Sequence, residues 1–263
     1  MTNLARPKNM RAARSGDEAM KGTILLVVHS GWREKRIHPH LAELGYRLEW
    51  CCPAEGGRLP ENFDAYAGAV VYGGVQSAND APAVAYMQHE LDWVGRFARS
   101  GGRYLGICLG GQLLARALGA RVDFHPEGLH EIGYHAIRPT PAAGDLFDGL
   151  THVYHWHKEG FELPAGSELL AAGDRFPNQA FRYRRAIGLQ FHPEVRGEDA
   201  RGWIEEVKDY DQRPGAQPRA LHLAGIERHD GAIDRWMSRF VDHWLAVGAS
   251  DARPAFEPRA AAG

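Results

Sequence analysis

The chain has 263 residues, 44% hydrophobic and 24% charged, so it is long enough to bury a sizeable core. Its formal net charge is −2 with both signs interspersed, which excludes the basic face that nucleic acid or an anionic membrane would require. No apolar run reaches the ~18 residues of a membrane span, and the N-terminus lacks the apolar core of a signal peptide. We therefore expect a cytoplasmic protein with neither nucleic-acid nor membrane partners.

Cysteine usage agrees with a reducing compartment. The three cysteines are an odd number, and no CxxC spacing is present. Cys51 and Cys52 are adjacent at the end of an apolar run and are expected to be buried packing residues. Cys108 stands alone and requires a separate explanation.

The two ends of the chain differ from the rest in composition and lack its hydrophobic periodicity. Residues 1–21 are polar, Arg-rich and aperiodic, and residues 249–263 read likewise, so both are expected to be flexible tails. Residues 22–248 show no repeat, low-complexity segment or linker. We expect one domain there.

The body alternates strand-like and helix-like segments. In its first half, the strands are expected at 23–28, 46–51, 68–72 and 103–107, and the helices at 34–44, 82–100 and 109–118. Shorter strands follow, at 120–124, 130–139, 151–156, 168–173, 179–183 and 186–191, before two helices at 198–209 and 230–247. This order predicts an α/β fold, a flavodoxin-like three-layer sandwich with a mostly parallel central sheet, helices on both faces and additional antiparallel edge strands.

The stretch "LGICLGGQ" places Cys108 between a strand and a helix, with Gly106 and Gly110 on either side. This G-x-C-x-G spacing is that of a nucleophile elbow, where a sharp turn brings the flanking backbones too close for side chains. The helix N-terminus favours the thiolate over the thiol. The N–H of Leu109 can face a developing oxyanion.

A thiolate nucleophile needs a proton shuttle and a group that orients it. Of the 14 histidines, His192 stands out because it ends an apolar strand in "IGLQFHPEV". Glu194 follows at i+2, a spacing that lets both side chains point the same way from an extended segment. We therefore predict a Cys108–His192–Glu194 catalytic triad.

Together, "GICLGGQ" and "FHPE" resemble the class I glutamine amidotransferases, enzymes that release ammonia from glutamine with a Cys–His–Glu triad. The resemblance covers residues 23–195. The segments "HWHKEGFELPAGSELLA" and "NQAFRY" resemble the stand-alone, GMP-synthase-like subgroup of this family.

The resemblance implies further site residues. "VVYGGV" is similar to the turn that supplies the second oxyanion N–H, so Gly74 would share the oxyanion hole with Leu109, and Gly73 would lie beside the substrate. Gln112 would contact glutamine. The strand "EIGYH" would meet the amino-acid end of the substrate around Tyr134 and His135.

Two departures from the family pattern stand near the expected site. Val75 replaces a proline after Gly-Gly, which could loosen the oxyanion turn. Lys158-Glu159 replaces the common Gly-Asp near the expected mouth of the site, which could change what the enzyme accepts.

The implied reaction passes through a γ-glutamyl thioester and requires no metal or organic cofactor. Because no nucleotide-binding motif is present, the ammonia would go to a separate synthetase or acceptor subunit. The triad alone leaves two alternatives open, a γ-glutamyl peptidase acting on γ-glutamyl conjugates and a non-catalytic regulatory protein that retains the fold.

"HVYHWHKE" contains His152, His155 and His157, a pattern that also suggests a metal site. His155 and His157 would share one face of a strand, but the sequence indicates no third ligand of suitable reach. We interpret these histidines as a packed or solvated strand and expect no metal.

Overall fold

The computed structural model describes residues 20–29 and 36–246. The predicted tails, 1–21 and 249–263, lie outside these ranges except for residues 20 and 21. Within the described ranges, no helix combines the length and hydropathy needed to cross a membrane.

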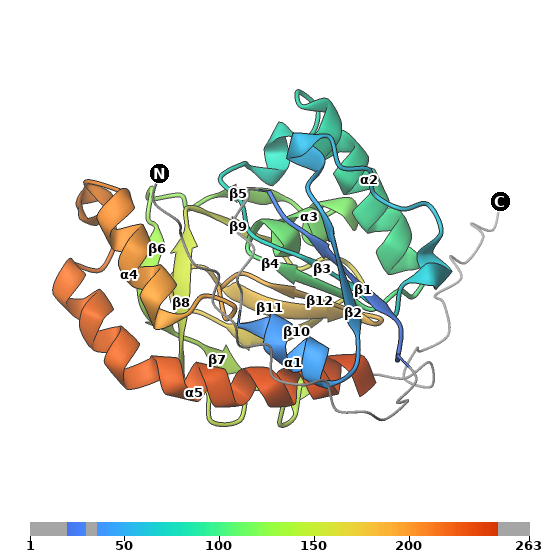
Figure 1. Ribbon diagram of the computed structural model, residues 1–263. Coiled ribbons are helices and arrows are strands. Elements are labelled where there is room, and N and C mark those ends of the chain that lie inside the picture. Colours follow the sequence, from blue (N-terminus) through green and yellow to red (C-terminus); the bar gives the residue numbers. More distant parts are fainter. Residues whose placement is uncertain (1–19, 30–35, 247–263) are drawn as a thin grey trace, which may run out of the picture.

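A central sheet runs through the middle of the molecule (Figure 1), in the order β2-β1-β3-β4-β12-β11-β10-β7. Its parallel half consists of β2 (Arg47–Cys51), β1 (Thr23–Val27), β3 (Gly68–Val71), β4 (Tyr104–Ile107) and β12 (Ala186–Leu189). Its antiparallel half consists of β11 (Asn178–Tyr183), β10 (Glu168–Ala172) and β7 (Arg138–Pro139). The order of the parallel half is the flavodoxin-like one, and the antiparallel strands extend one edge, as expected.

Two small antiparallel sheets lie beside the large one. β5 (Val122–Phe124) pairs with β9 (Glu159–Phe161), and β6 (Glu131–Ala136) pairs with β8 (His152–His157). The sequence did not indicate β9, because its three residues are too short to show an alternating pattern.

Helices cover both faces of the large sheet (Figure 1). Ile24 and Leu26 of β1 share a core with α1 (Ile37–Glu43) and α5 (Arg219–Ala246). The intervening residues Leu25 and Val27 share a second core with α2 (Ala85–Arg99) and α3 (Leu109–Ala117). Because successive side chains of a strand point to opposite faces, this split confirms the three-layer α/β sandwich.

The remaining helical elements are α4 (Gly197–Glu206), which packs on α5, and five short 3₁₀ turns. The turns are η1 (Pro53–Glu55), η2 (Phe63–Ala65), η3 (Ala78–Asp80), η4 (Pro141–Ala143) and η5 (Tyr210–Gln212).

Several helix boundaries differ from expectation. The helix expected at 34–44 spans Ile37–Glu43, and positions 34 and 35 lie outside the described residues. The helix expected from residue 82 begins at Ala85, because Ser77 and Asp80 form a capping box that closes η3 and Val84 is extended. The helix expected at 198–209 ends at Glu206, before an extended Val207. The last helix begins at Arg219, 11 residues before the expected 230. The sequence did not indicate these first turns because they lack a continuous apolar stripe.

Candidate active site

The carboxyl ends of three neighbouring parallel strands bring the predicted residues together. Gly73 follows β3, Cys108 follows β4, and His192 follows β12. A Cβ added to Gly73 would lie 2.7 Å from Cε1 of His192 and 3.5 Å from Cβ of Cys108. In open α/β sheets, this carboxyl edge is where ligands bind.

Cys108 lies on a strained turn, with φ of 51° and ψ of −105°, at the N-cap of α3. A Cβ on Gly106 would lie 2.4 Å from the carbonyl oxygen of Gly110. One on Gly110 would lie 2.0 Å from the carbonyl oxygen of Val71. These distances explain why glycine flanks the cysteine, as the sequence spacing predicted.

His192 lies between the thiol and the carboxylate. Its Nδ1 donates to Oε1 of Glu194 at 2.9 Å, and its side chain also hydrogen-bonds Cys108. Both His192 and Glu194 are buried. Burial lowers the pKa of His192, but the charges and hydrogen bonds of Cys108 and Glu194 outweigh burial and raise it to about 10. This environment favours the imidazolium form of His192.

The two residues expected to form the oxyanion hole follow the carboxyl ends of β3 and β4. Leu109 is the first residue of α3, whose first N–H groups have no partner within the helix. Gly74 follows Gly73 on the β3 turn, and its Cα packs against His29, since a Cβ there would lie 2.9 Å from Cβ of His29. Val75, the residue that replaces the family's proline, is 98% exposed and packs on little.

Gln112 is buried one turn into α3, and its side chain is engaged within the protein. Its Nε2 donates to the carbonyl oxygen of Glu159 at 2.9 Å and lies 3.4 Å from Oε1 of Gln190. Nε2 of Gln190 lies 4.0 Å from Sγ of Cys108. Sequence reasoning missed Gln190, although a glutamine inside the apolar run "IGLQF" was a usable indication.

Tyr134 and His135 lie on β6. The main-chain N–H of Tyr134 donates to Oε1 of Gln217 at 3.0 Å, and its carbonyl accepts from Nε2 of Gln217 at 2.6 Å. The ring of His135 contacts the carbonyl oxygen of Ile132 at 3.3 Å. The side-chain amide of Gln217 therefore hydrogen-bonds the same main-chain groups of Tyr134 that the resemblance assigned to substrate binding.

Glu131, His155 and His157 form a buried cluster across β6 and β8. Oε2 of Glu131 lies 3.3 Å from Nδ1 of His155 and 3.1 Å from Nε2 of His157. Nδ1 of His157 donates to the carbonyl oxygen of Glu159 at 3.0 Å, and Gln179 donates to Glu131 at 2.8 Å.

This cluster could hold a metal ion, because one ligand atom from each of its three residues lies within 4.8 Å of the others. The sequence showed no third ligand because Glu131 lies 24 positions before His155, and only the β6–β8 pairing joins them. His152 lies elsewhere, with its ring stacked on that of His229. The absence of a metal remains a prediction.

Lys158 and Glu159, which replace the family's common Gly-Asp, each contact a neighbouring side chain. The carboxylate of Glu159 is buried and accepts from Oγ of Ser77 at 2.8 Å. The ammonium of Lys158 lies over the ring of Phe124, 5.4 Å from its centroid.

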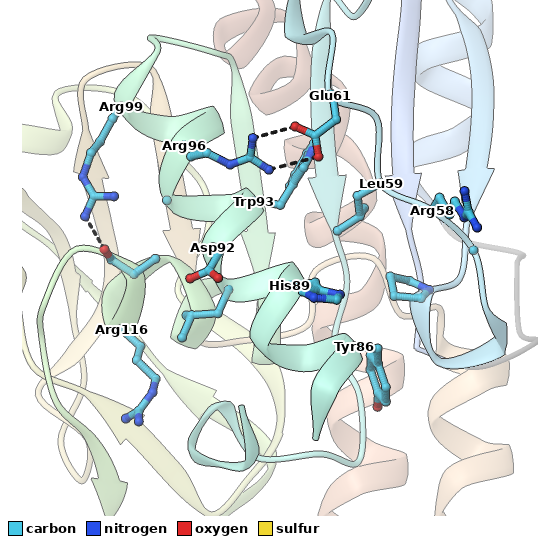
Figure 2. Close-up of a pocket in the computed structure, with 15 residues that line it drawn as sticks. Arg58, Leu59, Glu61, Tyr86, His89, Asp92, Trp93, Arg96, Arg99 and Arg116 are labelled. Atoms are coloured by element: carbon cyan, nitrogen blue, oxygen red, sulfur yellow. Dashed lines mark hydrogen bonds and ion pairs between the residues drawn. The ribbon is translucent and has the colours of Figure 1, made fainter. Parts of the chain in front are cut away.

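A cavity of about 1060 Å³ is lined largely by residues of α2 and of the segment from 53 to 61 (Figure 2). Arg96 pairs there with Glu61 at 2.6 Å, and Arg99 donates to the carbonyl oxygen of Ala117. None of its lining residues belongs to the triad. It is a surface hollow, separate from the candidate active site.

Comparisons with known proteins agree with this geometry. Residues 34–206 match the family model "Glutamine amidotransferase class-I". The chain is 31% identical over 201 residues to the glutamine amidotransferase-like protein YfeJ of Salmonella typhimurium, covering 68% of this chain and 78% of that one. It is 32% identical over 144 residues to the glutamine-hydrolysing GMP synthase of Porphyromonas gingivalis, covering 52% of this chain but only 27% of the synthase.

The fold has solved counterparts as well. A crystal structure of a glutamine amidotransferase from Thermotoga maritima superposes with a TM-score of 0.76 at 25% identity, covering 86% of this chain and 98% of that one. Both the family model and the alignment with YfeJ extend over most of the chain. The protein therefore belongs to the class I glutamine amidotransferase family.

Proposed function

We propose that this protein hydrolyses the side-chain amide of glutamine with Cys108 as nucleophile, His192 as acid and base, and Glu194 as the group that orients His192. The observation that carries the proposal is the strained Cys108 at a helix N-terminus, hydrogen-bonded to a histidine that is itself held at 2.9 Å by a buried carboxylate.

The first half-reaction forms a thioester. Sγ of Cys108 attacks the amide carbon of glutamine, and the oxyanion accepts hydrogen bonds from the N–H groups of Gly74 and Leu109. His192 donates its proton to the nitrogen as the C–N bond breaks, so ammonia leaves and a γ-glutamyl thioester remains. The raised pKa of His192 means that the proton is present at neutral pH.

The second half-reaction restores the enzyme. His192, now neutral, takes a proton from water as the water oxygen attacks the thioester carbon. The tetrahedral intermediate collapses with loss of the Cys108 thiolate, and glutamate leaves. Glu194 keeps the His192 ring oriented in both halves, because its carboxylate accepts from Nδ1 and leaves Nε2 facing the thiol.

The ammonia would be used by a separate protein. The match to GMP synthase covers about a quarter of that enzyme's length, and we propose that the acceptor chemistry of this protein resides on a partner chain. Gly73, Gln112, Tyr134 and His135 stay proposed substrate contacts. A contact at the main chain of Tyr134 requires Gln217 to leave it.

The test compares wild type, Cys108→Ala and the control Cys52→Ala for release of glutamate from L-glutamine and from γ-glutamyl dipeptides. We expect turnover of glutamine by wild type and the control, and none by Cys108→Ala. Turnover of dipeptides alone would identify a γ-glutamyl hydrolase instead. Turnover only with an added partner protein would identify a transferase subunit. If no γ-glutamyl substrate reacts and a diazoketone analogue of glutamine leaves Cys108 unlabelled, the enzymatic proposal is wrong.

A further inference from the structure

A second histidine–carboxylate pair lies directly behind the Gly73–Gly74 turn. His29 follows β1, and Glu90 lies on the buried face of α2. Nε2 of His29 lies 2.9 Å from Oε1 of Glu90, and Nδ1 of His29 lies 3.2 Å from the carbonyl oxygen of Gly73. Both side chains are 1% exposed or less.

Both ring nitrogens of His29 face oxygen atoms that can only accept. A carboxylate and a main-chain carbonyl have no proton to give, so two hydrogen bonds require a proton on each nitrogen. His29 is then an imidazolium paired with the Glu90 carboxylate. Burial lowers the pKa of His29, but Glu90 and the carbonyls of Gly73 and Tyr72 outweigh burial and raise it.

This pair acts on the peptide that joins Gly73 to Gly74. The peptide unit is planar and trans, so its C=O and N–H point in opposite directions. Holding the carbonyl of Gly73 toward His29 therefore directs the N–H of Gly74 the other way. Gly73 itself contacts His192 and faces Cys108, so the turn begins at the thiol.

The backbone of this turn is intrinsically flexible. Two successive glycines have the widest backbone freedom of any dipeptide, and the following Val75 is 98% exposed. The ring of His29 also packs against Gly74, where a Cβ would lie 3.0 Å from Cγ of His29. Gln76, whose Oε1 would lie 2.5 Å from that Cβ, and His29 together exclude a side chain at position 74, and His29 also bonds the carbonyl before it.

We propose that His29 and Glu90 are positioning residues that lock the Gly73–Gly74 peptide with the Gly74 N–H directed into the oxyanion site. The inference rests on the proposed function for its catalytic consequence, and on the geometry alone for the orientation of the peptide. Oε2 of Glu90 is buried and has no hydrogen-bond partner among the described residues. Such an unsatisfied group in a core calls for an explanation, and a positioning role gives one.

The test replaces the pair in two ways. His29→Leu/Glu90→Met removes the donor to Gly73 and fills the space with apolar atoms. His29→Asn/Glu90→Gln removes the ion pair but keeps a donor, because the Asn amide nitrogen occupies the place of Nδ1. His89→Leu, an exposed change on α2, is the matched control.

We expect the Leu/Met variant to lose about 10²- to 10³-fold in kcat, the loss seen when one oxyanion donor is removed, with little change in KM. The Asn/Gln variant should recover most of that loss.

If the Leu/Met and Asn/Gln variants both fold and retain the kcat of wild type, the pair has a purely structural role. A crystal structure of the Leu/Met variant gives a reading independent of turnover. An unchanged Gly73–Gly74 peptide there would overturn the inference, whereas an inactive wild type would overturn only the proposed function.

Discussion

Two buried histidine–carboxylate groups in this protein have opposite electrostatic character. His192 lies between Cys108 and Glu194, and its pKa is raised to about 10. His155 lies between Glu131 and His157, and burial, reinforced by the neighbouring histidines His157, His135 and His192, holds its pKa well below the usual value despite Glu131. A neighbouring carboxylate therefore does not by itself make a histidine a proton carrier. The identity of the third group decides whether the proton is retained.

The two groups also differ in what surrounds them. The Cys108 group lies on a strained turn at the carboxyl edge of the parallel sheet, at the N-terminus of α3. The Glu131 group lies inside the β6–β8 pair, and Gln179 donates a further hydrogen bond to Glu131. We therefore expect substitutions in the first group to affect turnover and those in the second to affect stability.

The largest effect is expected for Cys108→Ala, with a loss of at least about 10⁴-fold in kcat, because the covalent route disappears. Glutamate release measures it. Unfolding by urea should change by less than about 1 kcal/mol, since the side chain is small. A variant that retains more than a tenth of wild-type turnover would contradict a thiol nucleophile.

Glu194→Gln should lower kcat by about 10²- to 10⁴-fold, because the amide no longer holds His192 in the tautomer that faces the thiol. Steady-state kinetics with glutamine would show the loss in kcat, with KM less affected. Equal losses for Glu131→Gln would show that the two carboxylates are not distinguishable by role.

Glu131→Ala should destabilise the fold by roughly 3 kcal/mol, because it removes the common partner of His155, His157 and Gln179 from a buried site. Urea unfolding measures the change, with the exposed Glu162→Ala as control. Activity of the folded fraction should stay within about tenfold of wild type. Unchanged stability would show that the cluster contributes nothing to the fold.

The protonation contrast can be measured by NMR of labelled histidine. His192 should remain an imidazolium through neutral pH and titrate near pH 10, while His155 stays neutral. Since the folded pKa of His192 is raised above 6.5, its contribution to stability is complete below pH 6.5 and is lost as pH rises through about 10. Cys108→Ala should lower the midpoint. An unchanged midpoint in that variant would rule out Cys108 as a cause of the raised pKa of His192.

The smallest effect is expected from metal removal. Dialysis against a chelator should leave glutamine turnover and thermal unfolding unchanged, and elemental analysis should find far less than one equivalent of zinc per chain. A stoichiometric metal lost by His157→Ala would instead make the Glu131 cluster a metal site, since its ligand atoms are close enough to hold one.

The fold, the Cys108 turn and the His192–Glu194 pair were predictable because their determinants are local. Apolar runs and helical stripes are visible within short windows, and the glycines around Cys108 mark a turn whose sterics need no distant residue. Glu194 lies two positions from His192 and meets it directly.

The remaining contacts depend on how distant segments pair. His29 and Glu90 are 61 positions apart, and Gln217 lies 83 positions from Tyr134. No period or spacing links such residues before the strands are assembled. The start of α5 was misplaced for a similar reason, because its first turns are stabilised by packing on β6 and not by their own apolar stripe.

The position of β12 has a consequence for biosynthesis. β12 lies beside β4 in the sheet, although it follows β4 by about 80 residues in the chain. The ribosome therefore releases the Cys108 turn well before β12 and the His192 that follows it. Until β12 docks, the β4 edge is unpaired and the thiol has no base. On the proposed mechanism, a nascent or truncated chain that ends before His192 would be inactive.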